Sequence, residues 1–249
     1  MALWLAVGDV QSSWARARLG DRETETTELR RALAQLFDTG SKLFAPLFQG
    51  QLAELEAEGN DADGALGRID EALALANETG ARWTDALLHR VRGAILLKRD
   101  PANTAPAEDA FQSGIAVAQA QKARSFEVQA ALTLAKLYQA TSRPAEAHDV
   151  LAPALEGFSP TPEMPEIAEA EALLAALAAS EPVAAELKKR ETLSKLHAGY
   201  ALATMMTKGF GAEETKVALA KAASASEAAR TPEYWTVLYG RINADMMRP

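Results

Sequence analysis

The feature that most constrains the fold of this chain is a phrase that recurs three times at an almost constant interval. Each copy follows a run rich in Ala and Leu and precedes another apolar run. The interval from Gly40 to Gly80 nearly equals the interval from Gly80 to Lys122, which holds the matching position in the third copy. That period suits two antiparallel helices of about four turns each. The copies read Phe37-Asp-Thr-Gly-Ser-Lys-Leu-Phe, Asn77-Glu-Thr-Gly-Ala-Arg-Trp-Thr and Ala120-Gln-Lys-Ala-Arg-Ser-Phe.

Small residues recur at fixed offsets within this period. With Ala135 as the origin, Tyr138 stands at offset 3, Ala147 at offset 12, Leu151 at offset 16 and Ala154 at offset 19. Small residues at the origin, 12 and 19 let two helices cross closely, and the bulky residue at 16 fills the space between successive pairs. The same positions hold Ala53, Glu56, Ala65, Ile69 and Ala72 in one earlier copy, and Gly93, Leu96, Ala107, Phe111 and Gly114 in the other, with two extra loop residues.

The composition favours an all-α fold. Hydrophobic residues make up 48% of the 249 residues and are mostly Ala and Leu, which form helices readily and strands poorly. The turns agree, since Gly40 and Gly80 stand where a helix ends in a left-handed residue. The spacing resembles the tetratricopeptide (TPR) consensus, which implies a TPR-like α-α superhelix (solenoid) of antiparallel helix pairs, with about 11–12 helices.

The match to this repeat divides the chain into three parts. Residues 1–157 are expected to form TPR-like repeats, best matched over 43–157 and weakly over 12–39. Residues 158–182 are expected to form a proline-containing connection and a helix. Residues 183–249 are expected to form further helical repeats: a long helix to about Lys208, which carries Leu193, Leu196 and Tyr200, then helices at about 212–229 and 232–247.

Longer stretches carry a closer resemblance to one bacterial family. They resemble the C-terminal TPR region of predicted adenylate/guanylate cyclases that also carry an ATPase module, a region similar to the helical repeats of MalT-type activators. This chain has neither a cyclase aspartate pair nor a Gly-x-x-x-x-Gly-Lys-Ser/Thr loop. The resemblance therefore implies docking or sensing and no catalysis. The stretches are residues 68–80, 86–93, 123–155 and 208–216.

Charge and residue usage argue against several other functions. The net charge of −8 disfavours binding to nucleic acid, because the basic residues are scattered among acidic and apolar ones. The chain has no cysteine and no two of its three histidines are one helical turn apart, so we expect no metal site and no cofactor. No run approaches the ~20 apolar residues of a membrane-spanning helix. We expect a cytoplasmic protein that is not an enzyme and does not contact a membrane.

The expected working surface is the concave face, which the first helix of each pair lines in TPR arrays. The mixture of cationic, amide and small side chains there suits an extended or helical segment with acidic character. The alternative is that these positions are merely exposed and polar. Flanking the repeat origin, the predicted groove residues are Gly50, Glu54, Arg90, Ala94, Leu97, Gln129, Leu132, Lys136 and Gln139.

The sequence thus predicts a protein- or peptide-binding scaffold or regulatory module. The alternative is a small-molecule-sensing repeat domain of a signalling protein, either a cyclase/ATPase or a MalT-like regulator. Apolar stretches stand at both ends of the chain: Met1 to Val7 at the start, and Trp235 to Tyr239 and Met246 to Pro249 at the end. We therefore expect either that the chain is a piece of a longer repeat protein or that an end pairs with a second copy as a homodimer.

Overall fold

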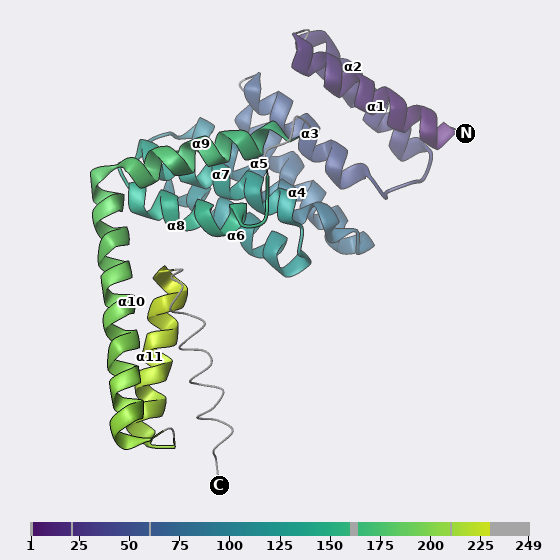
Figure 1. Ribbon diagram of the computed structural model, residues 1–249. Coiled ribbons are helices and arrows are strands. Elements are labelled where there is room, and N and C mark those ends of the chain that lie inside the picture. The colour runs from purple at the N-terminus through teal and green to yellow at the C-terminus, as the bar shows by residue number, and fades with distance from the viewer. Residues whose placement is uncertain (1, 21, 60, 160–163, 210, 230–249) are drawn as a thin grey trace. The chain divides into compact units, whose positions relative to one another are not determined.

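The structure is a computed structural model that describes residues 2–20, 22–59, 61–159, 164–209 and 211–229 (Figure 1). Within these ranges the chain is all-helical, with 11 α-helices, one short 3-10 helix (η1, Arg82–Thr84) and no strand. The helices are α1 (Ala2–Leu19), α2 (Arg22–Asp38), α3 (Ala45–Glu58), α4 (Ala62–Thr79), α5 (Asp85–Arg99), α6 (Ala105–Gln121), α7 (Arg124–Ala140), α8 (Pro144–Leu155), α9 (Pro165–Ala179), α10 (Glu181–Lys208) and α11 (Glu213–Ala229).

The chain divides into two compact units, Met1–Leu174 (unit 1) and Ala175–Pro249 (unit 2). The division falls within α9, whereas the repeat match suggested boundaries after residues 157 and 182. The long helix expected to end near Lys208 is α10, and the helix expected at 212–229 is α11. The helix expected at 232–247 lies outside the described residues.

Helices of unit 1 pack in sequence-adjacent pairs: α1 with α2, α3 with α4, α5 with α6 and α7 with α8. The first helices of successive pairs also contact one another, so that α1 touches α3, α3 touches α5 and α5 touches α7. These contacts bring together side chains from neighbouring copies of the repeat. The prediction of an all-α protein built of helix pairs is confirmed.

The positions assigned to helix packing by the repeat spacing are buried. Ala53 and Ala135 are fully buried, as are the bulky residues Ile69, Phe111 and Leu151. In the middle copy the origin is Gly93, and a Cβ atom built there would lie 2.5 Å from Cε1 of Phe111. Glycine is needed here because the aromatic ring of α6 packs directly on the backbone of α5.

The helix ends follow the repeat as well. Gly40 and Gly80 have φ angles of 77° and 72°, so both lie in the left-handed region that we predicted. Lys122 occupies the same repeat position and has a φ of 56°. All three copies thus break the chain with the same backbone conformation, although only two of them use glycine.

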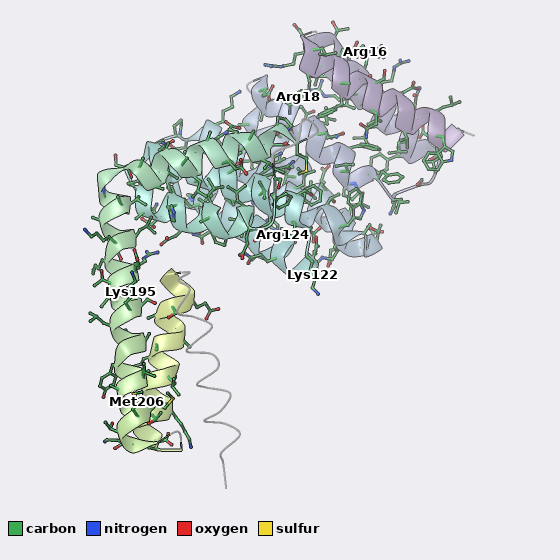
Figure 2. The ribbon with its side chains drawn as sticks, in the orientation of Figure 1. Arg16, Arg18, Lys122, Arg124, Lys195 and Met206 are labelled. Atoms are coloured by element: carbon green, nitrogen blue, oxygen red, sulfur yellow. The ribbon has the colours of Figure 1, made fainter. Side chains whose placement is uncertain are left out.

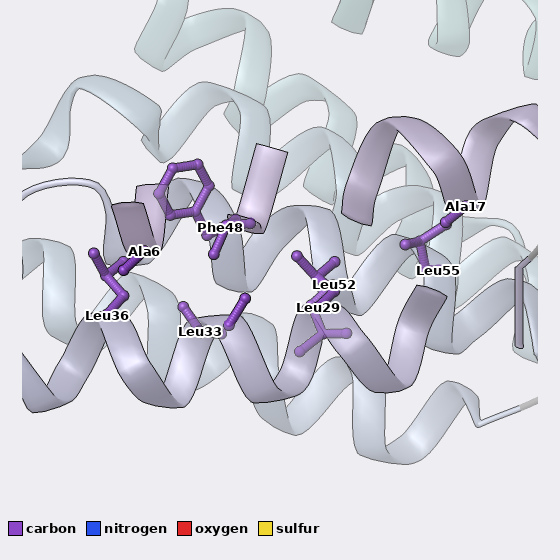
Figure 3. Packing of buried hydrophobic residues seen from close by; sticks show 10 residues of the cluster. Ala6, Ala17, Leu29, Leu33, Leu36, Phe48, Leu52 and Leu55 are labelled. Carbon is purple, nitrogen blue, oxygen red and sulfur yellow. The ribbon is translucent and has the colours of Figure 1, made fainter. Parts of the chain in front are cut away.

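The core of unit 1 begins with a cluster that joins the first three helices (Figure 3). Its large members include Leu29 and Leu36 from α2, and Phe48 and Leu52 from α3, all at most 1% exposed. A second cluster continues from α3 through α4 to α5. In unit 2 the core cluster is smaller and mostly alanine: Ala201, Ala218, Leu219, Ala222 and Ala223.

Within the described ranges, the helices are all too short or too polar to cross a membrane.

Candidate functional site

The predicted groove residues come from the first helices of three consecutive pairs. Glu54 lies on α3; Arg90, Ala94 and Leu97 lie on α5; Gln129, Leu132, Lys136 and Gln139 lie on α7. Because α3 contacts α5 and α5 contacts α7, these residues belong to one continuous layer of helices.

A ladder of charged side chains crosses the N-terminal part of this layer. The carboxylate of Glu54 pairs with Arg18 of α1 and with Arg90 of α5, whose Nη2 lies 3.4 Å from Oε1. Arg18, near the end of α1 in Figure 2, also donates a 2.7 Å hydrogen bond to Glu58. One carboxylate therefore links α1, α3 and α5, the first helices of three successive pairs. These side chains are between 19% and 34% exposed, so solvent screens the attraction only in part.

The C-terminal part of the layer is linked to α9 in the same way. Nε2 of Gln129 donates a 2.9 Å hydrogen bond to Glu166, and Nζ of Lys136 lies 2.7 Å from a carboxylate oxygen of Glu169. Both glutamates belong to unit 1. Each cation predicted for the groove thus has a carboxylate partner, which weakens the expected preference for acidic segments.

Two of the predicted positions pack inward. Leu132 is only 4% exposed and belongs to the core. Gly50 is buried, and a Cβ atom there would lie 2.7 Å from Cδ2 of Leu88, so glycine lets α3 and α5 approach closely. Ala94 and Leu97 are partly exposed and Gln139 is exposed. A ligand could contact these three residues of the layer without disrupting an ion pair.

Arg90 has an additional unsatisfied donor. Its Nε atom is buried and makes no hydrogen bond to any part of the chain that the structure describes. A buried donor without an acceptor costs about 1–3 kcal/mol. A ligand acceptor that reaches this atom after a small shift of the side chain would recover that energy.

The sequence reasoning missed the interaction made by Glu56. The Glu56 side chain is 3% exposed and accepts hydrogen bonds from Nε of Arg30 at 2.8 Å and from Nε of Arg68 at 2.7 Å. The signal was available, because Glu56 holds a repeat position that Leu96 and Tyr138 fill in the other copies. An isolated carboxylate at an apolar repeat position implies cationic partners on neighbouring helices.

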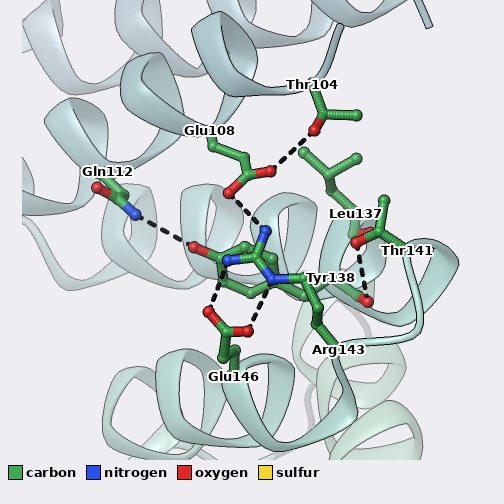
Figure 4. A network of polar contacts seen from close by, with 8 residues as sticks. All are labelled: Thr104, Glu108, Gln112, Leu137, Tyr138, Thr141, Arg143 and Glu146. Carbon is green, nitrogen blue, oxygen red and sulfur yellow. Dashed lines mark hydrogen bonds and ion pairs between the residues drawn. The ribbon is translucent and has the colours of Figure 1, made fainter. Parts of the chain in front are cut away.

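A second missed network surrounds Arg143 (Figure 4). The guanidinium lies 4.1 Å from the ring centroid of Tyr138 and pairs with Glu108 at 2.7 Å and Glu146 at 2.6 Å. Hydrogen bonds to Glu146 and Glu108 raise the pKa of Arg143, and Arg143 lowers the pKa of Glu146. The network joins α6, α7 and α8.

Arg82 and Arg124 occupy equivalent repeat positions, Arg82 in η1 just before α5 and Arg124 as the first residue of α7. Each pairs with the acidic residue three positions later, Asp85 at 2.8 Å and Glu127 at 2.5 Å. Arg124 also donates to the backbone carbonyl oxygen of Ala154, at 3.0 Å, near the end of α8. Glu56, Arg124 and Arg143 thus connect neighbouring helices, and Arg82 connects η1 to α5.

No family model matches the chain, and no curated protein matches it. The case for a function therefore depends on the residues and their geometry.

Proposed function

We propose that this chain is a non-enzymatic binding module, a scaffold or regulatory part of a bacterial cytoplasmic signalling protein, that holds a protein segment along the layer of α3, α5 and α7. The observation that carries the proposal is the charged ladder of Arg18, Glu54 and Arg90, next to the partly exposed Ala94 and Leu97. The TPR resemblance supports the same face.

The ladder makes this face suitable for binding because its long side chains are already ordered. A partner that docks on ordered side chains loses less conformational entropy than one that must immobilise them. Ala94 leaves room beside Arg90, whose free Nε donor suits a backbone carbonyl oxygen. Since the cations have carboxylate partners, we refine the expected ligand from an acidic segment to one that supplies hydrogen-bond acceptors and small apolar side chains.

A blocking substitution tests the proposal. Ala94→Arg places a large cation in the middle of the face, whereas Ala116→Arg places the same side chain on α6, the second helix of that pair. Each variant and the wild type serve as bait in a lysate of the source cells, with quantitative mass spectrometry. We expect a partner captured by wild type and Ala116→Arg to be lost with Ala94→Arg. Identical capture by all three baits would refute binding at this face.

A second candidate, small-molecule sensing, is favoured by a depression of about 540 Å³ between α2 and the α3–α4 turn. Its volume lies in the range of small-ligand sites. Thermal-shift screening tests it: a ligand whose stabilisation disappears in Thr27→Trp supports sensing there, and a flat screen counts against it. The depression is lined by Arg22, Glu23, Thr26, Thr27, Arg30, Leu55, Glu56, Glu58, Gly59 and Asp61.

Pairing of two copies through the apolar ends stays a proposal. At the N-terminal end, Trp4 and Leu5 of α1 are 67% and 65% exposed. The C-terminal apolar stretch lies outside the described residues. Sedimentation of a Trp4→Asp, Leu5→Asp variant would show whether the N-terminal end contributes to self-association.

A further inference from the structure

An exposed apolar stripe runs along α10 in unit 2. Leu193, Leu196 and Tyr200 are 44%, 65% and 63% exposed, and the exposed Ala203 and Thr207 continue the line. The steps between them alternate between three and four positions, which is the seam spacing of coiled coils. A different face of α10 packs on α11, where the core alanines lie. The stripe therefore has the spacing of a helix-packing surface while remaining open to solvent.

A strongly exposed cation lies near one end of the stripe and a strongly exposed anion near the other. Lys189, one turn before Leu193, is 68% exposed, and Glu213, at the start of α11, is 81% exposed. Their ion pairs within the chain are long, 3.7 Å from Lys189 to Glu186 and 3.6 Å from Lys216 to Glu213. Exposed pairs at such distances are weak, so both charges can exchange partners readily.

A depression of about 450 Å³ lies beside the C-terminal half of the stripe. It is bounded by Tyr200 on α10 and by Glu213, Val217 and Lys221 on α11. The hydroxyls of Ser194 and Ser226 are 2.9 Å apart, which sets the antiparallel register of the two helices. In that register Val217 comes level with residue 203, so the depression extends along the same part of α10 as the small residues of the stripe.

We propose that a second copy of this chain docks on the stripe, with the two α10 helices antiparallel and a two-fold axis at Tyr200. That register brings Leu193 level with the second copy's Thr207 and Leu196 within one position of its Ala203, so large side chains meet small ones. The leucines of each copy enter the depression of the other. In the register of Ser194 and Ser226, Glu213 comes level with residue 207 of its own copy, which faces Leu193 of the second copy, so Lys189 of that copy lies one helical turn from Glu213.

Self-complementarity is the reason for choosing a second copy as the occupant. A two-fold interface uses the same patch twice, so every favourable contact must be matched by its symmetry mate. The stripe meets this requirement in size, because the leucines and the small residues lie at nearly equal distances on either side of Tyr200. It also meets it in charge, because the cation and the anion lie at opposite ends. The interface lies in unit 2 and does not involve the face proposed above for segment binding.

Sedimentation equilibrium of the full chain tests the proposal directly. The wild type should show a concentration-dependent mass between that of one chain, 26.6 kDa, and two. Leu196→Asp should weaken the dimer at least about tenfold, since it buries two carboxylates in the seam. Leu202→Asp is the matched control, because Leu202 lies on the other flank of α10 and is 46% exposed. Circular dichroism should show unchanged helix content in both variants.

Charge reversal and cross-linking test the register. Lys189→Glu should weaken the dimer roughly fivefold at low salt, and the double variant Lys189→Glu, Glu213→Lys should restore it to within about twofold. Since the chain has no cysteine, Tyr200→Cys should form a disulfide dimer under mild oxidation, and Leu202→Cys should not. The proposal is overturned if wild type is monomeric at every concentration, if both aspartate variants behave alike, or if the charge swap fails to rescue.

Discussion

Lys122 shows how a single residue can carry a backbone conformation that does not suit it. Its φ of 56° belongs to the left-handed region, where the two preceding copies use Gly40 and Gly80. In that region a Cβ atom approaches the following carbonyl oxygen, which costs a non-glycine residue about 1–2 kcal/mol. The helix nonetheless ends there, because the Lys122 backbone N–H bonds back to Gln119 and α7 must begin two residues later.

We expect Lys122→Gly to raise the free energy of unfolding by about 0.5–1 kcal/mol, because relief of the left-handed strain exceeds the added entropy of glycine in the unfolded chain. Urea denaturation followed by circular dichroism measures the change. Lys122→Ala removes the same charge but keeps the Cβ atom, so it should give no gain. Equal stabilisation by both variants would attribute the effect to charge instead.

Two glycines within helices should respond oppositely to alanine. Gly93→Ala would force the fully buried Phe111 to move and should destabilise the protein by about 1–3 kcal/mol. A Cβ atom at Gly67, on the exposed side of α4, would have no atom within 4 Å. Gly67→Ala should therefore stabilise the protein by about 0.5–1 kcal/mol. Thermal unfolding of the two variants measures whether each substitution raises or lowers the melting temperature. Destabilisation by Gly67→Ala would contradict the prediction that a Cβ atom at this position meets open space.

His89 makes stability depend on pH. Burial lowers its pKa below the ordinary value of 6.5; the nearby Asp85 opposes this shift, and Arg92 and Arg82 add to it. The unfolded chain therefore binds the proton more tightly, so the free energy of unfolding should fall as the pH drops below about 6.5, until the folded pKa is passed. Urea midpoints at pH 7.5 and 5.5 should differ less in His89→Asn than in wild type. An equal difference in both would exclude His89 as the cause.

At the scale of helices, Glu56 determines how the first two pairs are joined. It lies on α3 and is held by Arg30 of α2 and Arg68 of α4. The carboxylate is 3% exposed, while the arginines are 47% and 27% exposed and keep part of their hydration. Removal of the buried charge would leave two cations without their acceptor.

We therefore expect Glu56→Gln to lower the free energy of unfolding by about 1–3 kcal/mol, less than a fully buried pair because solvent screens the arginines. Glu78→Gln is the control, since Glu78 is 67% exposed in its pair with Lys42 and should change stability by at most about 0.5 kcal/mol. Urea denaturation measures both changes. Urea is chosen over guanidinium chloride because it is uncharged and does not screen the ion pairs. Similar effects from both substitutions would show that burial of Glu56 adds nothing.

At the scale of the whole molecule, the two units differ in the quality of their cores. The clusters of unit 1 contain Phe48, Ile69 and several leucines, whereas the core cluster of unit 2 has four alanines and Leu219. Alanine buries little apolar area, so each helix of unit 2 gains less from packing. Stability should therefore be lower in α10 and α11 than in α5 to α8.

Native-state hydrogen exchange tests this difference on the full chain. Amides of α10 and α11 should exchange through an opening of lower free energy than those of α5 to α8. In the Leu196→Asp variant, α10 and α11 should again have the lower opening free energy. That opening free energy should fall further than in wild type if self-association stabilises unit 2. A single opening free energy for all these helices would mean that both units unfold together.

The helix pairs of residues 45–155 could be predicted because their signals are local and repeated. Ala53, Gly93 and Ala135 mark the same packing position, and the turns recur in register. The candidate binding face was harder to predict from the sequence. Nothing local indicates that Leu132 is buried or that Glu54 is shared by two arginines, each 36 residues away in the sequence. Those properties depend on which helices become neighbours.

The sequence by itself determined the all-helical fold, the helix pairs and the left-handed ends at Gly40 and Gly80, because helix propensity and small-residue spacing act over a few turns of chain. The tertiary structure alone decided which charges remain available. It paired Glu54, Lys136 and Glu56 with residues of other helices and left the stripe on α10 exposed. The physical reason is that electrostatic pairing and burial depend on distances between helices, which the sequence pattern does not contain.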